Sequence, residues 1–392
     1  MVNQIEAEDL RDKLDAGDDF VLIDTRNPED FDGWHVAGAR NVEYSSSQSE
    51  LRGDFDQYRD ELDADTDIVT TCATGASAVA FAEWLENEGY DNVSTVDGGM
   101  EAWSMVYDVV PIATRSDDLE ILQLQRRSKG CLGYIVGSKS AGEAAAIDVT
   151  RATETFIDAA AERGLEITHV FDTHVHADHI SGGRRLADQL GVPYHLGAPA
   201  ETRNPKYEFD AVEPNDTVEI GSVDVKAVHT PGHTTGMTSW LVDDEALMTG
   251  DTLFVESIGR TELQFADSDA QDGARTQYET LHRAIMTMPN DVKILPGHFS
   301  VTDEGEYIDV TPGTPMLSTV GKVWETNSIL RLDEEEFVEH MFENLPSKPP
   351  NYETVIATNQ GDYTPEDEAE ENELELGPNR CAATSDSVVA DD

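Results

Sequence analysis

The sequence predicts two folded domains, first an α/β domain with a parallel sheet and then an α+β sandwich with helices outside its two sheets. Three observations support this fold class. The chain has 392 residues, more than one ordinary domain contains. Its first part alternates short apolar strands with short helices, whereas later strands follow one another directly. The expected domains are 1–112 and 118–360.

Short buried strands define the first domain. They are expected at 21–26 (VLIDTR), 67–72 (DIVTTC) and 93–96 (VSTV). Apolar residues recur at helical spacing over 77–88, and Gly89 ends that helix. Because helices separate the strands, the sheet is expected to be parallel and covered on both faces.

The second domain is expected to begin after a linker at 109–118, which contains a proline and a polar run. LEILQLQ and CLGYIVGS predict neighbouring strands, and helices are expected over 151–163 and 273–287. Further strands are expected in ITHVFD, VDVKAVHT, MTSWLVD, EALMTGD and VKILPGH. Residues 361–392 lack an apolar period and are densely acidic, so a disordered tail is expected.

The charge is strongly negative, with 26 Lys and Arg against 80 Asp and Glu, a net −54. Such a field repels nucleic acid and anionic membranes, so neither is expected as a partner. The acids interrupt well-patterned apolar segments, which indicates a folded, salt-adapted protein from a halophile; an acidic protein of a mesophile is the alternative.

A cytoplasmic location is expected. No apolar run reaches the ~18 residues of a membrane span. The acidic N-terminus does not have the pattern of a signal peptide. The three cysteines are far apart in the sequence, as in a thiol-reduced compartment.

Cys72 is the first candidate for chemistry, because it ends a strand and precedes a tight loop and a helix. Backbone amides and the helix dipole in such a loop lower a thiol pKa and can hold a persulfide anion. A small buried cysteine without a chemical role is the alternative. The candidate persulfide loop comprises Ala73, Thr74, Gly75, Ala76 and Ser77.

A second set of residues has the spacing of metal ligands. THVHADHISGG follows a strand, and TPGHTTG, TGDTLF and LPGHF each follow a later strand. One sheet edge is therefore expected to gather imidazoles and carboxylates into a metal site, with a purely structural metal as the alternative. The candidate ligands are His174, His176, Asp178, His179, His233, Asp251 and His298.

The first domain resembles the rhodanese-like sulfurtransferases. LIDTRNPEDFDGWHVAGARNV, CATGAS and DGGMEAW occur in that family's order and spacing. The resemblance implies that Cys72 carries the persulfide and that Asp24, Arg26 and His35 are structural. Many family loops contain an arginine, and CATGAS contains none.

The second domain resembles the metallo-β-lactamase fold, an αββα sandwich. Its persulfide dioxygenase branch implies one Fe(II), bound by His174, His233 and Asp251. His176, Asp178, His179 and His298 are then the second shell. The glyoxalase II-like branch instead implies two Zn or Fe ions. His174, His176 and His233 would bind one, Asp178, His179 and His298 the other, and Asp251 would bridge them.

Further motifs favour the dioxygenase branch. ESIGRTEL is similar to its GRTD-type motif, which implies that Arg260 binds the carboxylate of a small thiol. The segment 326–352 is similar to that branch's C-terminal segment. Phe299-Ser300 replaces its usual Asp-Tyr, so a thiol other than glutathione, such as γ-glutamylcysteine or coenzyme A, is expected.

The leading hypothesis is an iron-dependent dioxygenase that converts a low-molecular-weight thiol persulfide, O₂ and water into sulfite and thiol. A fused rhodanese domain would transfer sulfur. The alternatives are a dinuclear thioester hydrolase and a non-catalytic sulfur carrier with a structural metal. Family resemblance also implies a homo-oligomer.

Overall fold

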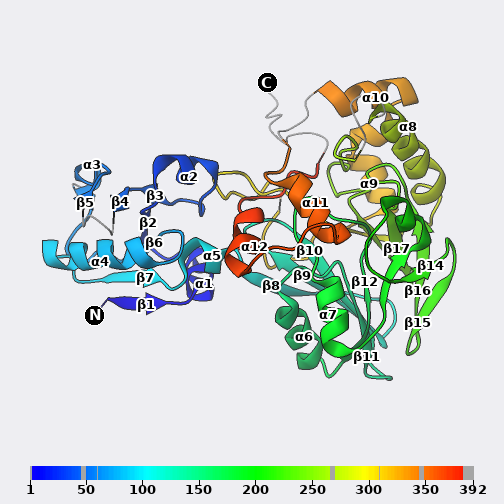
Figure 1. The fold of residues 1–392 in the computed structure, drawn as a ribbon, viewed down its shortest axis with the longest axis horizontal. Helices are drawn as coiled ribbons and strands as arrows, with labels where there is room; N and C mark the ends of the chain where they lie inside the picture. The colour runs from blue at the N-terminus through cyan, green and yellow to red at the C-terminus, as the bar shows by residue number, and fades with distance from the viewer. Residues whose placement is uncertain are drawn as a thin grey trace.

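The computed structural model describes residues 2–45, 50–59, 61–264, 270–308, 310–343 and 348–382. The chain folds into two lobes, with the first domain in one and the sandwich in the other (Figure 1). The helices α11 (Tyr352–Gln360) and α12 (Glu368–Leu374) lie beside the junction of the two lobes (Figure 1).

The first lobe contains the expected parallel sheet, whose strand order is β1-β7-β6-β2-β3. Its strands are β1 (Asn3–Ile5), β2 (Val21–Asp24), β3 (Arg40–Asn41), β6 (Ile68–Thr71) and β7 (Val93–Val96). The helices are α1 (Ala7–Ala16), α2 (Pro28–Gly33), α3 (Asp56–Arg59), α4 (Ala76–Glu88) and α5 (Gly99–Trp103). The small pair β4 (Tyr44–Ser45) and β5 (Glu50–Leu51) stands apart. This confirms the α/β class.

The second lobe contains two mixed sheets, as expected. The seven-stranded sheet has the order β14-β13-β12-β11-β10-β9-β8, and the six-stranded sheet runs in order from β15 to β20. Their apolar faces form one core that includes Tyr134, Phe171 and Trp240. This core holds the sheet edges in place where the candidate ligands emerge.

The first of these sheets comprises β8 (Tyr107–Ile112), β9 (Leu119–Arg126), β10 (Leu132–Ser138), β11 (Glu143–Ile147), β12 (Glu166–Phe171), β13 (Tyr194–Gly197) and β14 (Asp210–Val212). The second comprises β15 (Thr217–Ile220), β16 (Val223–His229), β17 (Thr238–Val242), β18 (Ala246–Gly250), β19 (Lys293–Pro296) and β20 (Ser318–Thr319). The α-helices are α6 (Thr153–Glu162), α7 (Gly183–Leu190), α8 (Ala270–Thr280), α9 (Val320–Thr326), α10 (Glu334–Glu343), α11 (Tyr352–Gln360) and α12 (Glu368–Leu374). Shorter helical turns are η1 (Ala198–Arg203), η2 (Leu281–Ile285) and η3 (Ser328–Arg331).

The expected linker at 109–118 is partly wrong, because its first residues belong to β8. This strand pairs antiparallel with β9, with Val109 opposite Leu124. Pro111 is tolerated there because β8 is at the edge of its sheet, where one side of the strand needs no partner. The second domain therefore starts near Tyr107 rather than at 118.

The expected disorder of the tail is wrong for 361–382. This stretch contains α12, and Glu375 is buried among cations of the sandwich. The acidic composition of this stretch does not indicate its ion-pair partners, because they come from distant parts of the sequence. Residues 383–392 lie outside the described part of the chain.

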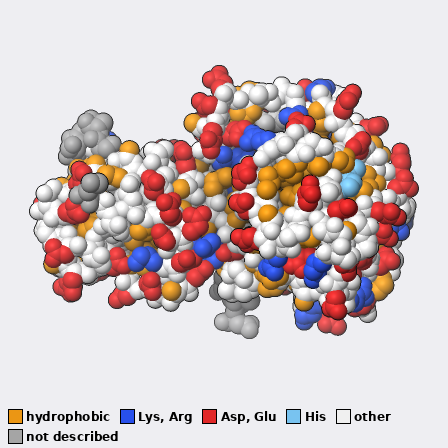
Figure 2. Space-filling view, turned by 90° about the horizontal axis from the view of Figure 1, so that it is seen from below, with side chains coloured by type: hydrophobic (Ala, Val, Ile, Leu, Met, Phe, Trp, Pro, Cys, Tyr) orange, Lys and Arg blue, Asp and Glu red, His pale blue; other side chains and the backbone are white. Residues whose placement is uncertain are grey.

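Acidic side chains are spread over both lobes on the face shown in Figure 2. None of the described helices combines the length and apolarity needed to cross a bilayer. With 80 acids against 26 Lys and Arg, self-repulsion opposes the compact state unless salt screens it.

We therefore expect the melting temperature to rise as KCl increases from the millimolar to the molar range. Thermal unfolding, followed by circular dichroism at fixed pH, measures this dependence. A melting temperature that is independent of KCl would contradict the salt-adapted interpretation and favour the acidic mesophilic one.

Candidate metal centre and persulfide loop

The seven candidate ligands lie at the strand ends where the sequence placed them. The segment after β12 carries His174, His176, Asp178 and His179. His233 follows β16, Asp251 follows β18, and His298 follows β19. All seven side chains are buried. The structure therefore brings them to one edge of the sandwich.

Three of them form a group that we call the triad: His174, His233 and Asp251. One ligand atom of each lies within 4.8 Å of the others. The Asp251 carboxylate Oδ2 is 3.6 Å from His233 Nε2 and 3.9 Å from His174 Nε2. The described residues offer no hydrogen bond to His174 Nε2 or Asp251 Oδ2, although both atoms are buried. Buried polar atoms without partners fit a metal ion at this point.

Neighbouring groups orient the triad imidazoles. His233 Nδ1 donates to the Arg260 carbonyl at 2.6 Å, which directs Nε2 toward Asp251. His174 Nδ1 hydrogen-bonds Thr173 Oγ1 at 2.9 Å. Burial lowers the pKa of His174 well below its usual value, and burial also lowers the pKa of His233. Both rings are therefore neutral at pH 7, as metal ligation requires.

A second group comprises Cys131, Asp178, His179 and His298. His298 lies between two carboxylates: Nδ1 is 2.8 Å from Asp251 Oδ1, and Nε2 is 2.8 Å from Asp178 Oδ2. Burial alone would lower the pKa of His298, but Asp251 and Asp178 outweigh it and raise the pKa well above its usual value. His298 therefore acts as a hydrogen-bonding partner of the triad carboxylate.

His176 lies against two of the other candidate ligands, with ring centroids 4.3 Å from His174 and 4.2 Å from His179, and it also faces a further carboxylate. Its Nε2 is 3.4 Å from Asp148 Oδ1, and Asp148, Asp172 and His176 form a further group of possible ligands. Sequence reasoning missed Asp148 and Asp172. The available signal was their position directly after the strands β11 and β12, which is the pattern that identified the histidines.

Sequence reasoning also missed Cys131 and Cys381. Cys131 Sγ is 3.5 Å from Asp178 Oδ2. Burial raises the pKa of Cys131, but the His179 and His298 imidazoles together outweigh it and lower the pKa to about 7. Cys381 shares a possible ligand group with Asp178, Asp251 and His298. No sequence signal indicated Cys381, because it follows the acidic run that predicted disorder.

Arg260 lies beside the triad and is buried. Its guanidinium pairs with Glu262 and donates to the Arg380 carbonyl at 2.9 Å. Its own carbonyl accepts the hydrogen bond from His233. The predicted binding of a substrate carboxylate by Arg260 stays a prediction, since the guanidinium is held by protein groups here.

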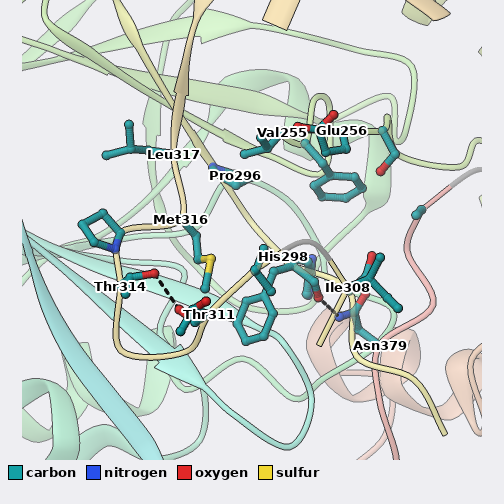
Figure 3. A pocket seen from close by; sticks show the side chains of 17 residues that line it. Val255, Glu256, Pro296, His298, Ile308, Thr311, Thr314, Met316, Leu317 and Asn379 are labelled. Atoms are coloured by element: carbon teal, nitrogen blue, oxygen red, sulfur yellow. Dashed lines mark hydrogen bonds between the residues drawn. The ribbon is translucent and has the colours of Figure 1, made fainter. Parts of the chain in front are cut away.

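A cavity of about 290 Å³ opens beside His298. Figure 3 shows that residues from several segments line it, among them Met316 and Leu317. Phe299 and Ser300, which replace the expected Asp-Tyr pair, also line this cavity. The cavity is therefore mostly apolar, and His298 of the second ligand group is in its wall.

The persulfide loop has the expected geometry around Cys72. The Gly75 amide donates to Cys72 Sγ at 3.1 Å, and α4 begins at the next residue. Gly99 allows close approach, because a Cβ at this position would lie 2.2 Å from the Cys72 carbonyl oxygen. Loop residues Ala73, Thr74 and Ala76 are exposed, whereas Cys72 is buried. The loop can thus support a sulfur anion through its amides.

The three expected structural residues of the first domain are well positioned. The buried Asp24 carboxylate forms a salt bridge with Arg26, which also donates to the Trp34 carbonyl. His35 Nδ1 donates to the Phe31 carbonyl at 2.8 Å. These contacts stabilise the turn around α2.

Comparison with known proteins agrees with this architecture. Residues 6–105 match the rhodanese-like domain model, and residues 137–298 match the metallo-beta-lactamase superfamily model. The mitochondrial persulfide dioxygenase of Homo sapiens is 31% identical over 234 residues, which cover 58% of this chain and 82% of that protein. The hydroxyacylglutathione hydrolase of Rhodospirillum rubrum is 32% identical over 166 residues, covering 42% of this chain and 60% of that protein.

A solved structure is also similar. ETHE1 from Myxococcus xanthus superposes with a TM-score of 0.53 at 26% identity, covering 62% of this chain and 98% of that chain. The relatives thus include both a persulfide dioxygenase and a hydroxyacylglutathione hydrolase.

Proposed function

We infer the function from one premise: this chain belongs to the persulfide dioxygenase family of the metallo-β-lactamase superfamily and carries a rhodanese-like domain. We propose that it oxidises a thiol persulfide with O₂ and water to sulfite and thiol. The observation that carries the proposal is the triad of two imidazoles and one carboxylate, in which His174 Nε2 and Asp251 Oδ2 have no hydrogen-bond partner among the described residues.

One Fe(II) per chain fits this triad. Two histidines and one carboxylate are the ligand set of non-haem iron oxygenases, in which iron supplies open positions for substrate and O₂. His174, His233 and Asp251 would hold the metal. The second group is less available, because both nitrogens of His298 already bind carboxylates. His298 keeps Asp251 oriented toward the triad.

The substrate would approach through the cavity beside His298. Its apolar wall, including Met316 and Leu317, suits the methylene part of a thiol and excludes bulk water. Phe299 adds an aromatic ring to this wall. A small thiol other than glutathione, such as γ-glutamylcysteine or coenzyme A, is the proposed carrier.

The first domain would deliver or remove sulfane sulfur. Cys72 would hold the persulfide, and the Gly75 amide at 3.1 Å would stabilise the anionic sulfur. The absence of an arginine in the loop limits binding of free anionic donors such as thiosulfate. A relay of sulfur within the protein therefore suits this loop better than a free-standing sulfurtransferase.

Replacing Cys72 by serine tests the role of the first domain. We expect Cys72→Ser to lose sulfur transfer to background and to retain oxygen uptake with an added thiol persulfide. Sulfurtransferase and oxygen-electrode assays on the same sample separate the two activities. Equal loss of sulfur transfer and oxygen uptake would contradict the assignment of these two activities to different domains.

A dinuclear thioester hydrolase is the second candidate. It is favoured because Asp178 and His298 lie next to Asp251, and His179 lies next to Asp178 and His298. It is also favoured by the similarity to a hydroxyacylglutathione hydrolase. Two bound metals and hydrolysis of S-D-lactoyl thiols would support this candidate.

The decisive test is oxygen uptake by the purified full chain in multimolar KCl, with Fe(II) and a panel of thiol persulfides. Iron is measured in the same sample. Uptake with stoichiometric sulfite and one iron per chain would establish the dioxygenase. No uptake, combined with two metals and thioester hydrolysis, would establish the hydrolase instead.

A further inference from the structure

A cysteine from the C-terminal segment, which we define as residues 375–382, enters the metal centre. Cys381 is fully buried. Its Sγ and one ligand atom each of Asp178, Asp251 and His298 lie within 4.8 Å of one another. Asp251 also belongs to the triad, whose Asp251 Oδ2 and His174 Nε2 have no hydrogen-bond partner among the described residues. A thiol of the protein itself thus lies where a thiol substrate would have to bind.

Specific contacts hold this segment in place. The Arg260 backbone amide donates to the Cys381 carbonyl at 2.9 Å, and the Arg260 guanidinium donates to the Arg380 carbonyl at 2.9 Å. Asn379 Nδ2 donates to the Phe299 carbonyl at 3.1 Å (Figure 3). These bonds fix the backbone beside Cys381, so the thiol reaches the metal centre in a defined position. Arg260, the predicted anchor for a free thiol, thus also binds this segment.

The same segment also faces the persulfide loop. A cavity of about 550 Å³ lies between the two domains, and Ala73 of the persulfide loop is in its wall. Gly377, Pro378 and Arg380 of the C-terminal segment form part of the opposite wall. One segment therefore connects the surroundings of Cys72 with the interior of the metal centre.

We propose that Cys381 is an internal thiol substrate, which receives sulfane sulfur from Cys72 and presents it as a persulfide to the metal centre. This inference rests on the proposed dioxygenase function and adds a second substrate to the small thiol persulfides: a persulfide on a cysteine of the protein itself. For the transfer, the segment releases Arg260 and moves Cys381 across the cavity toward the persulfide loop.

The chemistry balances in two steps. In the first, the Cys381 thiolate attacks the outer sulfur of the Cys72 persulfide. The old S–S bond breaks, Cys72 leaves as a thiolate, and the new S–S bond forms on Cys381 without net oxidation. In the second, the Cys381 persulfide, O₂ and water give the Cys381 thiol and sulfurous acid, with O₂ as the oxidant. The thiol is regenerated, so no free thiol is consumed.

Mass spectrometry of the iron-loaded full chain tests the first step without relying on turnover. The protein is treated with inorganic polysulfide under anaerobic conditions and desalted, and the Cys72 and Cys381 peptides are then weighed. We expect one added sulfur atom on Cys381 in the wild type and none on Cys381 in Cys72→Ser. The matched control is Ala382→Ser, whose position is adjacent to Cys381 and pairs with Gly259; it should still accept sulfur. An unmodified Cys381 in the wild type, or equal modification in Cys72→Ser, would overturn the relay.

Admission of air to the same desalted samples tests the second step. The wild type should release sulfite without any added thiol, and Cys381→Ser should release only background sulfite. Thiol-free sulfite from Cys381→Ser at the wild-type level would overturn the relay. Oxygen uptake with added thiol persulfides would still support the dioxygenase in that case. No uptake with any persulfide, in either protein, would instead overturn the proposed function.

Discussion

Replacing Asp251 by alanine is expected to abolish sulfite production and to remove iron from the protein. Asp251 belongs to the triad and is the anionic group nearest to both triad imidazoles, at 3.6 Å and 3.9 Å. Loss of a residue that only orients a ligand costs about 10–100-fold in metal affinity or activity. Loss of the ligand itself should exceed that range.

The substitution also removes a partner of His298. His298 Nδ1 would lose the Asp251 Oδ1 contact at 2.8 Å and keep the Asp178 contact. The imidazole would then remain buried with one nitrogen unpaired, which costs about 1–3 kcal/mol of stability. We therefore expect a lower melting temperature as well as lost activity.

Elemental analysis and an oxygen electrode measure the two main effects on one sample. Asp158→Ala is a suitable control, because it removes an exposed carboxylate on α6 in the same domain. The control should keep its iron and its oxygen uptake. Full activity in Asp251→Ala would refute the assignment of the triad as the catalytic iron site.

The ligand positions could be predicted from the sequence because each follows an apolar strand. Strand ends of one sandwich meet at a common edge, so short local patterns were enough to place His233, Asp251 and His298 together. Gly297 also has a clear local reason, since a Cβ there would lie 2.6 Å from Asp251 Oδ1. The close packing of Gly297 against Asp251 thus explains why a glycine precedes the histidine in LPGHF.

The C-terminal segment could not be predicted in the same way. Its order depends on Glu375 and Cys381, whose partners lie far away in the sequence. The composition of a stretch describes its average polarity. It cannot indicate that one carboxylate and one thiol within the stretch are buried. β8 is a similar case, because only its pairing with β9 distinguishes it from a linker.

Replacing Glu375 by glutamine is expected to be the most destabilising single change in the C-terminal segment. Its carboxylate bonds Arg126 at 3.0 Å, Arg151 at 2.6 Å and the Ile180 amide at 2.5 Å. All three charged side chains are buried. Removing one partner of a buried ion pair costs about 3–5 kcal/mol, because the opposite charges stay buried without compensation.

The stability lost in Glu375→Gln should be largest near neutral pH and should decrease as the pH falls. Burial raises the pKa of Glu375, but Arg126 and Arg151 outweigh it and lower the pKa from 4.5 to about 2. The wild-type carboxylate therefore contributes its full stabilisation above about pH 4.5, and this contribution is lost as the pH falls toward 2. The stability difference between wild type and Glu375→Gln should shrink over this interval.

Thermal unfolding in constant high KCl, repeated across this pH interval, measures the difference. Glu373→Gln removes an exposed carboxylate two residues away and is the matched control, with an expected change within about 0.5 kcal/mol. Release of the segment should also make Cys381 reactive toward iodoacetamide, although it is fully buried in the wild type. A Glu375→Gln protein with wild-type stability and a protected Cys381 would show that the segment is held by its backbone contacts rather than by this buried charge.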